Sequence, residues 1–229
     1  MFNQLLDRLA GSARSLRQPA GSDISTPAGR RSAVWHALLM DHGLLRTVWS
    51  NLHEVAPGVW RSNQPSPRRL RRFHEMGIRG VINLRGAPRS SYYLFEEEAC
   101  RDLGLVLVNC PFSARRLPPA ADLLRLLDLF RTVPRPFVMH CKSGADRSGL
   151  AAALYLMAEA DVPVAEARKQ LGLRYLHLRG GPKGVLSCML DAYARDTAET
   201  PMPIRQWLET RYDPVALQAE FDAARGRRG

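Results

Sequence analysis

One short stretch of the sequence combines residue types that could hold and attack an anion. It runs from His140 to Gly149 and reads HCKSGADRSG. Five residues separate Cys141 from Arg147, and a hydroxyl residue, Ser148, follows the arginine. Because a thiolate is a strong nucleophile, this spacing indicates nucleophilic chemistry at Cys141.

The residues between the cysteine and the arginine favour an anion-binding loop. Short side chains at Ser143, Gly144 and Ala145 let the backbone curl so that successive N–H groups converge on one point. The helix predicted to follow would direct the positive end of its dipole to the same point. This field would stabilise a thiolate and hold a phosphate group at hydrogen-bond distance.

The other residues of the stretch have separate expected roles. Arg147 would offer a planar fork that grips two phosphate oxygens into the transition state. Ser148 would donate to the thiolate and help it leave, while His140 would orient the cysteine from behind. Lys142 would contact the substrate phosphate, as would the backbone of the short residues that follow it.

The elements around this stretch predict an α/β fold. Strands are expected at 58–61, 80–84, 105–109 and 137–140, and helices at 66–74, 92–103 and 119–133. From Gly149 onward only helices are expected, at 149–160, 163–171, 184–195, 203–211 and 214–225. The alternation predicts a mostly parallel central sheet flanked by helices, with a helical C-terminal half. In such sheets the chemistry lies beyond the carboxyl ends of the strands.

The N-terminal part reads as an extension of residues 1–31 before a folded domain of residues 32–229. Residues 2–17 have helical amphipathic spacing, residues 18–32 read as a flexible linker rich in Pro, Gly and Ser, and residues 33–53 read as two short helical stretches. No window reaches the roughly 18 apolar residues of a membrane span. Asp7 and Arg8 interrupt the place where a secretory signal needs apolar residues.

The cysteine pattern favours a reducing, cytoplasmic compartment. The four cysteines, Cys100, Cys110, Cys141 and Cys188, are too sparse for a disulfide scaffold, and none falls in a C-x-x-C pair. The histidines show no metal-ligand spacing and are expected at the surface or in packing (His36, His42, His53, His74 and His177). The sequence therefore predicts no metal site.

The positive net charge suggests nucleic-acid binding, but the composition argues against it. Thirty-three Lys and Arg oppose 22 Asp and Glu, a net charge of +11, but only three of the cations are lysines. Aromatic residues make up only 7% and no basic–aromatic module is present, so nucleic-acid binding ranks last among the functions. The excess charge could instead hold residues 1–17 at an anionic membrane surface.

The stretch HCKSGADRS resembles the signature H-C-x5-R-S/T of the cysteine-dependent protein tyrosine phosphatase superfamily. The neighbouring segments WRSNQPSP, GIRGVINLRG and VNCPFSARR are similar to its dual-specificity-like bacterial branch, over roughly residues 55–195. The resemblance implies a dual-specificity-phosphatase-like fold and hydrolysis of phosphomonoesters. Cys141 would form a thiophosphate intermediate that water hydrolyses, with no metal or other cofactor.

One departure from the family concerns the general acid, which is normally an Asp about thirty residues before the cysteine. Residues from Leu105 to Ala121 include no Asp or Glu. They offer Arg115 and Arg116, which could bind a second phosphate or acidic headgroup, or be solvated charges. Asp146 could serve as the acid, or could tie down the loop by accepting backbone N–H bonds.

The resemblance leaves the substrate open between a phosphorylated protein and a phosphorylated lipid. Phosphotyrosine is the default. An Asp before the loop arginine, as at Asp146, is similar to myotubularin and Sac-type phosphoinositide phosphatases, and Lys142 resembles the phosphatase and tensin homolog. A phosphate-binding pseudophosphatase and a rhodanese-like sulfur transferase are further alternatives.

Weaker signals lie outside the loop. Arg61 and Arg85 follow predicted strands at the expected active edge, where they could bind a second phosphate or be solvated. Gln170 and Arg174, in the stretch KQLGLRYLHL, resemble the region where relatives position the hydrolytic water, but a structural helix is the first expectation.

Overall fold

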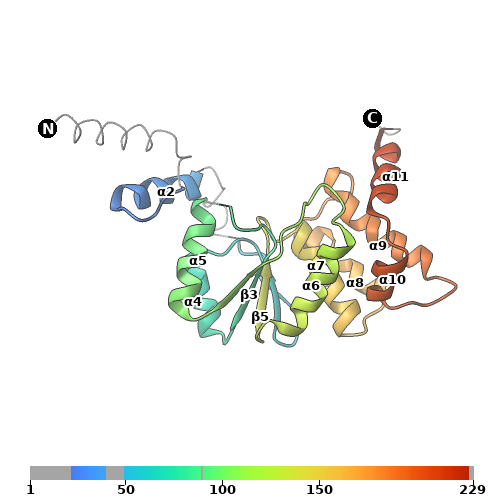
Figure 1. The fold of residues 1–229 in the computed structure, drawn as a ribbon, viewed down its shortest axis with the longest axis horizontal. Coiled ribbons are helices and arrows are strands. Elements are labelled where there is room, and N and C mark those ends of the chain that lie inside the picture. Colours follow the sequence, from blue (N-terminus) through green and yellow to red (C-terminus); the bar gives the residue numbers. More distant parts are fainter. Residues whose placement is uncertain (1–21, 40–48, 89, 227–229) are drawn as a thin grey trace, which may run out of the picture.

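The computed structural model describes residues 22–39, 49–88 and 90–226 (Figure 1). These residues contain a five-stranded sheet in the order β1-β2-β5-β3-β4. Its strands are β1 (His53–Ala56), β2 (Val59–Ser62), β3 (Gly80–Asn83), β4 (Val106–Asn109) and β5 (Phe137–His140). β1 pairs antiparallel with β2 and every other pairing is parallel, which confirms the predicted α/β class.

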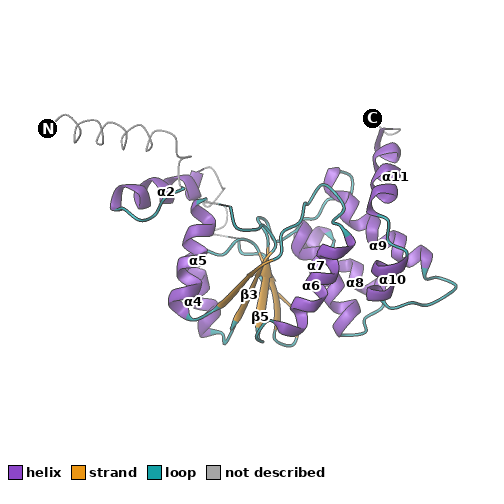
Figure 2. Cartoon of the chain, viewed as in Figure 1, coloured by secondary structure: helices purple, strands orange, loops and turns teal. Residues whose placement is uncertain are grey.

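Helices cover both faces of this sheet (Figure 2). One layer holds α4 (Pro67–Glu75) and α5 (Ser91–Leu103), with α2 (Pro27–Leu39) packed on α5. The opposite layer holds α6 (Ala120–Thr132) and α7 (Asp146–Glu159). Beyond them lie the C-terminal helices α8 (Val164–Ala167), α9 (Val185–Asp196), α10 (Ile204–Thr210) and α11 (Pro214–Gly226). Among the described residues, no strand follows β5, as the sequence predicts.

The central strands are apolar on both faces because each face supports a separate core. Val81 and Val138 belong to the smaller core, which also holds Leu70, Phe73 and Cys100 of α4 and α5. Their neighbours along the strands, such as Ile82 and Met139, belong to the larger core with α6 and α7. A strand buried on both faces needs a continuous apolar run, and β3 and β5 supply one.

The register of the sheet brings three strand ends to one edge. Ser62 at the end of β2 and Asn83 at the end of β3 both pair with His140 at the end of β5. The backbone N–H of Leu84 then donates to the His140 carbonyl at 2.9 Å. The chain after His140 therefore leaves the sheet from its middle, between two supporting strands.

Some predicted boundaries are wrong. α2 begins at Pro27, so residues 27–32 of the predicted linker are helical. His53, expected in a helical stretch, opens the strand β1, which a turn at Pro57–Gly58 joins to β2. β1 has only four residues, too few to show the alternation of apolar and polar residues that marks a strand in a sequence.

α7 begins at Asp146, three residues before the predicted start at Gly149, because its polar first turn belongs to the loop sequence. The helix predicted over 163–171 divides into α8 and a 3-10 turn, Arg168–Gln170.

The predicted helix of residues 2–17 lies outside the described residues, and the division of the chain at residue 32 remains a prediction. Among the residues that the structure describes, no helix is long and apolar enough to cross a membrane.

We predict that Phe130→Ala lowers the free energy of unfolding by about 3–5 kcal/mol. The Phe130 side chain is fully buried on α6, and its ring packs against the rings of Phe137 and Tyr155. Urea unfolding would measure the loss. Val215→Ala, at a side chain that is 78% exposed, is the control and should change stability by less than about 0.5 kcal/mol. A Phe130→Ala variant as stable as wild type would contradict this account of the core.

Candidate active site

The cysteine loop connects β5 to α7 at the carboxyl edge of the sheet (Figure 1). Cys141 follows the last residue of β5 directly and is buried. Arg147 and Ser148 lie in the first turn of α7. The structure thus brings the predicted nucleophile, the predicted phosphate fork and the positive end of a helix dipole to one place.

A buried arginine, Arg61 at β2, holds the outer side of this loop. Its Nη2 donates to the carbonyls of Gly144 and Ala145 at 2.7 and 3.1 Å. Its Nη1 donates to the backbone and side-chain oxygens of Gln170 at 2.7 and 2.8 Å, and the guanidinium lies 3.9 Å from the centre of the Tyr175 ring. Burial lowers the pKa of Arg61 to about 10, so it stays charged at neutral pH.

Arg61 is therefore neither a solvated charge nor a phosphate ligand, the two alternatives left by the sequence. It is a positioning residue that acts through the loop backbone. Gln170, expected in a structural helix, lies in a 3-10 turn and accepts two of its hydrogen bonds.

Two further groups hold the preceding carbonyls of the loop. The Asn51 side-chain amide donates to the carbonyl of Ser143 at 3.1 Å, and the backbone N–H of Gln64 donates to the carbonyl of Lys142 at 3.3 Å. Four successive carbonyls, those of residues 142–145, are thus engaged on the outer side. The loop N–H groups are left to converge on its inner side, as an anion nest requires.

Gly144 is the residue that permits this curl. Its φ is +71°, in the left-handed region that favours glycine. A Cβ atom at this position would lie 2.7 Å from the backbone nitrogen of Asn63. The structure thus accounts for the glycine among the short residues of the loop.

The surroundings of Cys141 favour the thiolate. Burial alone would raise the pKa of this thiol, but several neighbours outweigh burial and lower it. These are the charge of Arg147, the hydroxyl and backbone N–H of Ser148, and the backbone N–H of Gly144. The Cys141 thiol therefore ionises more readily than an ordinary cysteine thiol.

Arg147 is oriented by the sheet and retains donors for an anion. Its Nη1 donates to the Leu84 carbonyl at 3.1 Å, at the end of β3. Its Nε is buried and has no hydrogen-bond partner among the described residues. A buried donor without a partner is costly, so a phosphate oxygen bound here would remove that cost.

Asp146 is buried in a network of side chains. Its two oxygens lie 2.9 Å from His177 Nδ1 and 2.9 Å from Lys183 Nζ. Nε2 of His177 lies 2.9 Å from the Ser187 hydroxyl. Burial would raise the pKa of Asp146, but hydrogen bonds and charges from His177 and Lys183 outweigh it and lower the pKa. This environment keeps the Asp146 carboxylate ionised. It favours the alternative in which Asp146 holds the loop in place, although the donors are side chains rather than backbone N–H groups.

His140 precedes Cys141 and is fully buried. Its Nε2 lies 2.5 Å from Oε1 of Glu96, which is also fully buried. The other oxygen of Glu96 accepts from the Gln64 side chain at 2.9 Å. Sequence reasoning missed Glu96 among its neighbouring acids. Its spacing from the buried Tyr93 and Cys100, three and four residues away, was the available signal.

The remaining predicted residues are spread more widely. Lys142 and Ser143 are half-buried, whereas Arg115 and Arg116 are exposed in the segment between β4 and α6. In the described part of the chain, no hydrogen bond or ion pair joins either arginine side chain to the cysteine loop. Arg85 donates to the Gln64 side chain at 2.9 Å and lies over the Tyr92 ring.

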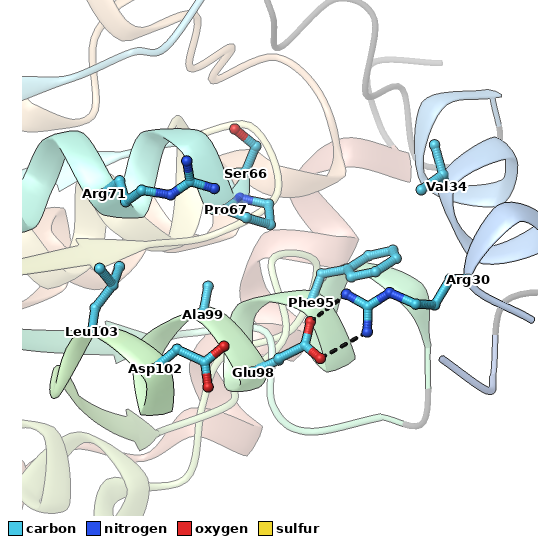
Figure 3. A pocket seen from close by; sticks show the side chains of 10 residues that line it. All are labelled: Arg30, Val34, Ser66, Pro67, Arg71, Phe95, Glu98, Ala99, Asp102 and Leu103. Carbon is cyan, nitrogen blue, oxygen red and sulfur yellow. Dashed lines mark hydrogen bonds and ion pairs between the residues drawn. The ribbon is translucent and has the colours of Figure 1, made fainter. Parts of the chain in front are cut away.

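A separate cavity of about 490 Å³ lies between α2, α4 and α5 (Figure 3). Arg30 and Glu98 form a two-point ion pair along its side, at 2.8 and 2.7 Å. None of the predicted site residues lines this cavity. Within the described residues, no group of His, Cys, Asp and Glu is placed to hold a metal ion.

Solved structures share the fold at low sequence identity. TpbA from P. aeruginosa, in complex with pTyr, is 17% identical with a TM-score of 0.51, covering 66% of this chain and 96% of its own. The core catalytic domain of the PP-IP phosphatase SIW14 from S. cerevisiae is 15% identical with a TM-score of 0.52, covering 67% and 96%. A putative phosphatase (DUF442) from Shewanella putrefaciens CN-32 is 17% identical with a TM-score of 0.52, covering 65% and 95%.

The family comparison is more specific. Among curated proteins, no sequence matches this chain. A family model described as "DSP-PTPase phosphatase fused to NAD+ Kinase" matches residues 47–177, more than half of the chain. That segment includes all five strands, the cysteine loop and the groups that hold its carbonyls. The chain therefore belongs to this DSP-PTPase family, and it is a cysteine-based, protein-tyrosine-phosphatase-like enzyme of the dual-specificity type.

Proposed function

We propose that the enzyme hydrolyses phosphomonoesters through a thiophosphate intermediate on Cys141. The observation that supports this most directly is the thiolate-stabilising environment of Cys141 beside the partly unsatisfied Arg147. Nucleophile, anion nest and arginine fork come from one continuous loop, so their relative placement depends little on distant motion. This arrangement argues against a pseudophosphatase that only binds phosphate.

In the first step, the Cys141 sulfur attacks phosphorus and the bond to the leaving oxygen breaks. The inward N–H groups of the loop and the Arg147 fork bind the equatorial oxygens and stabilise their charge in the transition state. In the second step, water attacks phosphorus, the S–P bond breaks and inorganic phosphate is released. The Ser148 hydroxyl, which lies close enough to Cys141 to lower the pKa of its thiol, donates to the departing thiolate in place of its 3.4 Å contact with the Ser62 carbonyl. Neither step as written uses a metal.

The leaving oxygen needs a proton unless it is already a stable anion. The segment from Leu105 to Ala121 has no carboxylate, and Asp146 is held ionised by His177 and Lys183. We therefore infer that substrates with acidic leaving groups, such as aryl phosphates, are hydrolysed readily. Phosphotyrosine, whose leaving group is a phenol, is the default substrate on this ground.

A phosphorylated lipid or inositol-type substrate is the second candidate. The exposed Arg115 and Arg116, together with Lys142 in the loop, would suit a substrate that carries additional negative charge. One neighbour in fold, SIW14, is described as a PP-IP phosphatase, which is consistent with this alternative. A panel of phosphopeptides against phosphorylated lipids and inositol phosphates would separate the two candidates.

The domain and compartment assignments remain proposals. We propose a phosphatase domain over residues 32–229 and an N-terminal extension over residues 1–31. The four cysteines are free in the structure, which supports a reducing, cytoplasmic compartment.

We predict that Cys141→Ser abolishes turnover of a small aryl phosphate, by at least about a thousandfold, because a serine hydroxyl is not ionised here. Cys188→Ser is the matched control. Burial and the charges of Asp191 and Glu220 raise the pKa of Cys188, which lies outside the cysteine loop. The control should keep the wild-type rate. Substantial turnover by Cys141→Ser would refute the proposed intermediate.

Asp146→Asn should slow an aryl phosphate and an alkyl phosphate by similar factors, because Asp146 positions the loop and does not donate the proton. Steady-state kcat/KM for the two substrates would measure the ratio. A loss for the alkyl phosphate at least tenfold greater than for the aryl phosphate would instead identify Asp146 as the general acid. Asp122→Asn, at the start of α6 and outside the cysteine loop, is the control and should leave both rates unchanged.

Arg61→Lys should lower kcat/KM by about a hundredfold, since an ammonium cannot replace a fork that bonds Gly144, Ala145 and Gln170 together. A loosened nest stabilises the thiolate less, so the pKa of Cys141 should rise. The pH profile of inactivation by iodoacetate should shift to higher pH. Arg79→Lys, at an exposed arginine before β3, is the control. An unchanged profile would show that Arg61 does not act through the loop.

A further inference from the structure

Three exposed leucines lie in the segment between α8 and α9, which contacts the cysteine loop and its supporting residues. Leu173, Leu176 and Leu178 are 72%, 61% and 65% exposed, although soluble proteins usually bury such side chains. Between them, Tyr175 and His177 are buried. Over residues 173–178 the chain therefore directs its polar-tipped rings into the protein and its leucine side chains out of it.

The buried residues fasten this segment to the catalytic machinery. The Asn51 amide that donates to the Ser143 carbonyl also donates to the Tyr175 carbonyl, at 3.2 Å. The Tyr175 ring supports the Arg61 guanidinium, and His177 contacts Asp146. The exposed leucines are thus held at the border of the cysteine loop by the contacts that shape that loop.

Leu176 adopts a backbone conformation that disfavours a branched side chain. Its φ is +61°, in the left-handed region, where it ends the 3-10 turn Leu173–Tyr175. Glycine would relieve this steric cost. The Leu176 side chain is 61% exposed, so burial does little to offset this steric cost. A leucine at this position therefore indicates a role for the side chain outside the folded chain.

The same segment is strongly basic. From residue 167 to residue 190 the chain has no Asp or Glu but has Arg168, Lys169, Arg174, Arg179 and Lys183. Carboxylates from outside the stretch, Glu166, Asp191 and Asp146, form ion pairs with four of these cations. Five cations against three carboxylates leave a positive excess around the leucines.

We propose that this surface, the leucine rim formed by Leu173, Leu176 and Leu178 with its flanking cations, docks the enzyme on an anionic lipid bilayer. The leucines enter the interfacial region and the cations lie at the level of the headgroups. Apolar anchors that recognise proteins fit into pockets of the partner, whereas a fluid bilayer accepts separate projecting side chains without a matching shape. This inference goes beyond the proposed reaction and would place the Cys141 loop facing the membrane.

The test is sedimentation of the full chain with vesicles of phosphatidylcholine containing phosphatidylserine. The inactive Cys141→Ser chain should bind as wild type, so that docking is measured apart from catalysis. Combined substitution of Leu173, Leu176 and Leu178 by Ser should weaken vesicle binding at least tenfold, and pure phosphatidylcholine should bind the wild type weakly. Circular dichroism melts would confirm that the leucine variant remains folded.

A matched control replaces three other exposed apolar side chains, Met76, Val106 and Val215, by Ser, and should bind as wild type. Absence of wild-type binding to the anionic vesicles would overturn the proposal. So would equal binding by the leucine variant, which would assign membrane contact to residues 1–17 or another surface. If the leucine variant binds vesicles normally but loses kcat/KM toward soluble phosphopeptides, the rim recognises protein and the proposal is wrong.

Discussion

The active site depends on one buried charge, the guanidinium of Arg61. A fully buried cation is unfavourable unless its donors are satisfied. Here two loop carbonyls and the two oxygens of Gln170 accept from Nη1 and Nη2 and the Tyr175 ring lies against the guanidinium, while Nε has no hydrogen-bond partner among the described residues. The interactions are mutual, because the loop supplies acceptors that stabilise the charge and the charge turns those carbonyls away from Cys141. A nest of N–H groups, a stabilised thiolate and a phosphate site all follow from that orientation.

The sheet supplies the frame in which this contact forms. β5 lies between β2 and β3, so the cysteine loop leaves the sheet with a strand end on either side. β2 contributes Arg61 from one side, and the segment after β3 contributes the Leu84 carbonyl that orients Arg147 from the other. Both faces are packed, which fixes the strands that carry these groups. Because β5 lies between the parallel strands β2 and β3, residues from both neighbours can hold the cysteine loop.

The parts of the site that could be predicted from sequence are those that are close together in the chain. The residues from Cys141 to Ser148 form their own nest, so their types and spacing indicate the chemistry directly. The class of fold was equally accessible, because buried strands and amphipathic helices carry strong patterns. Arg61 and Asn51 reach the loop across 83 and 92 residues, and nothing in their local sequence marks that contact. His177 is polar by type and buried only by the tertiary fold, whereas the burial of Glu96 is indicated only by its helical spacing from apolar neighbours.

The outward bonds of the loop carbonyls also bear on how the protein opens. Residues 142–145 are tied to Asn51, Arg61 and Gln64, which belong to the sheet or to its flanking segments. The loop therefore cannot fray alone, because releasing it breaks bonds to the central strands. The catalytic nest therefore belongs to the same cooperative unit as the core, so its inward N–H groups keep their orientation without a bound anion.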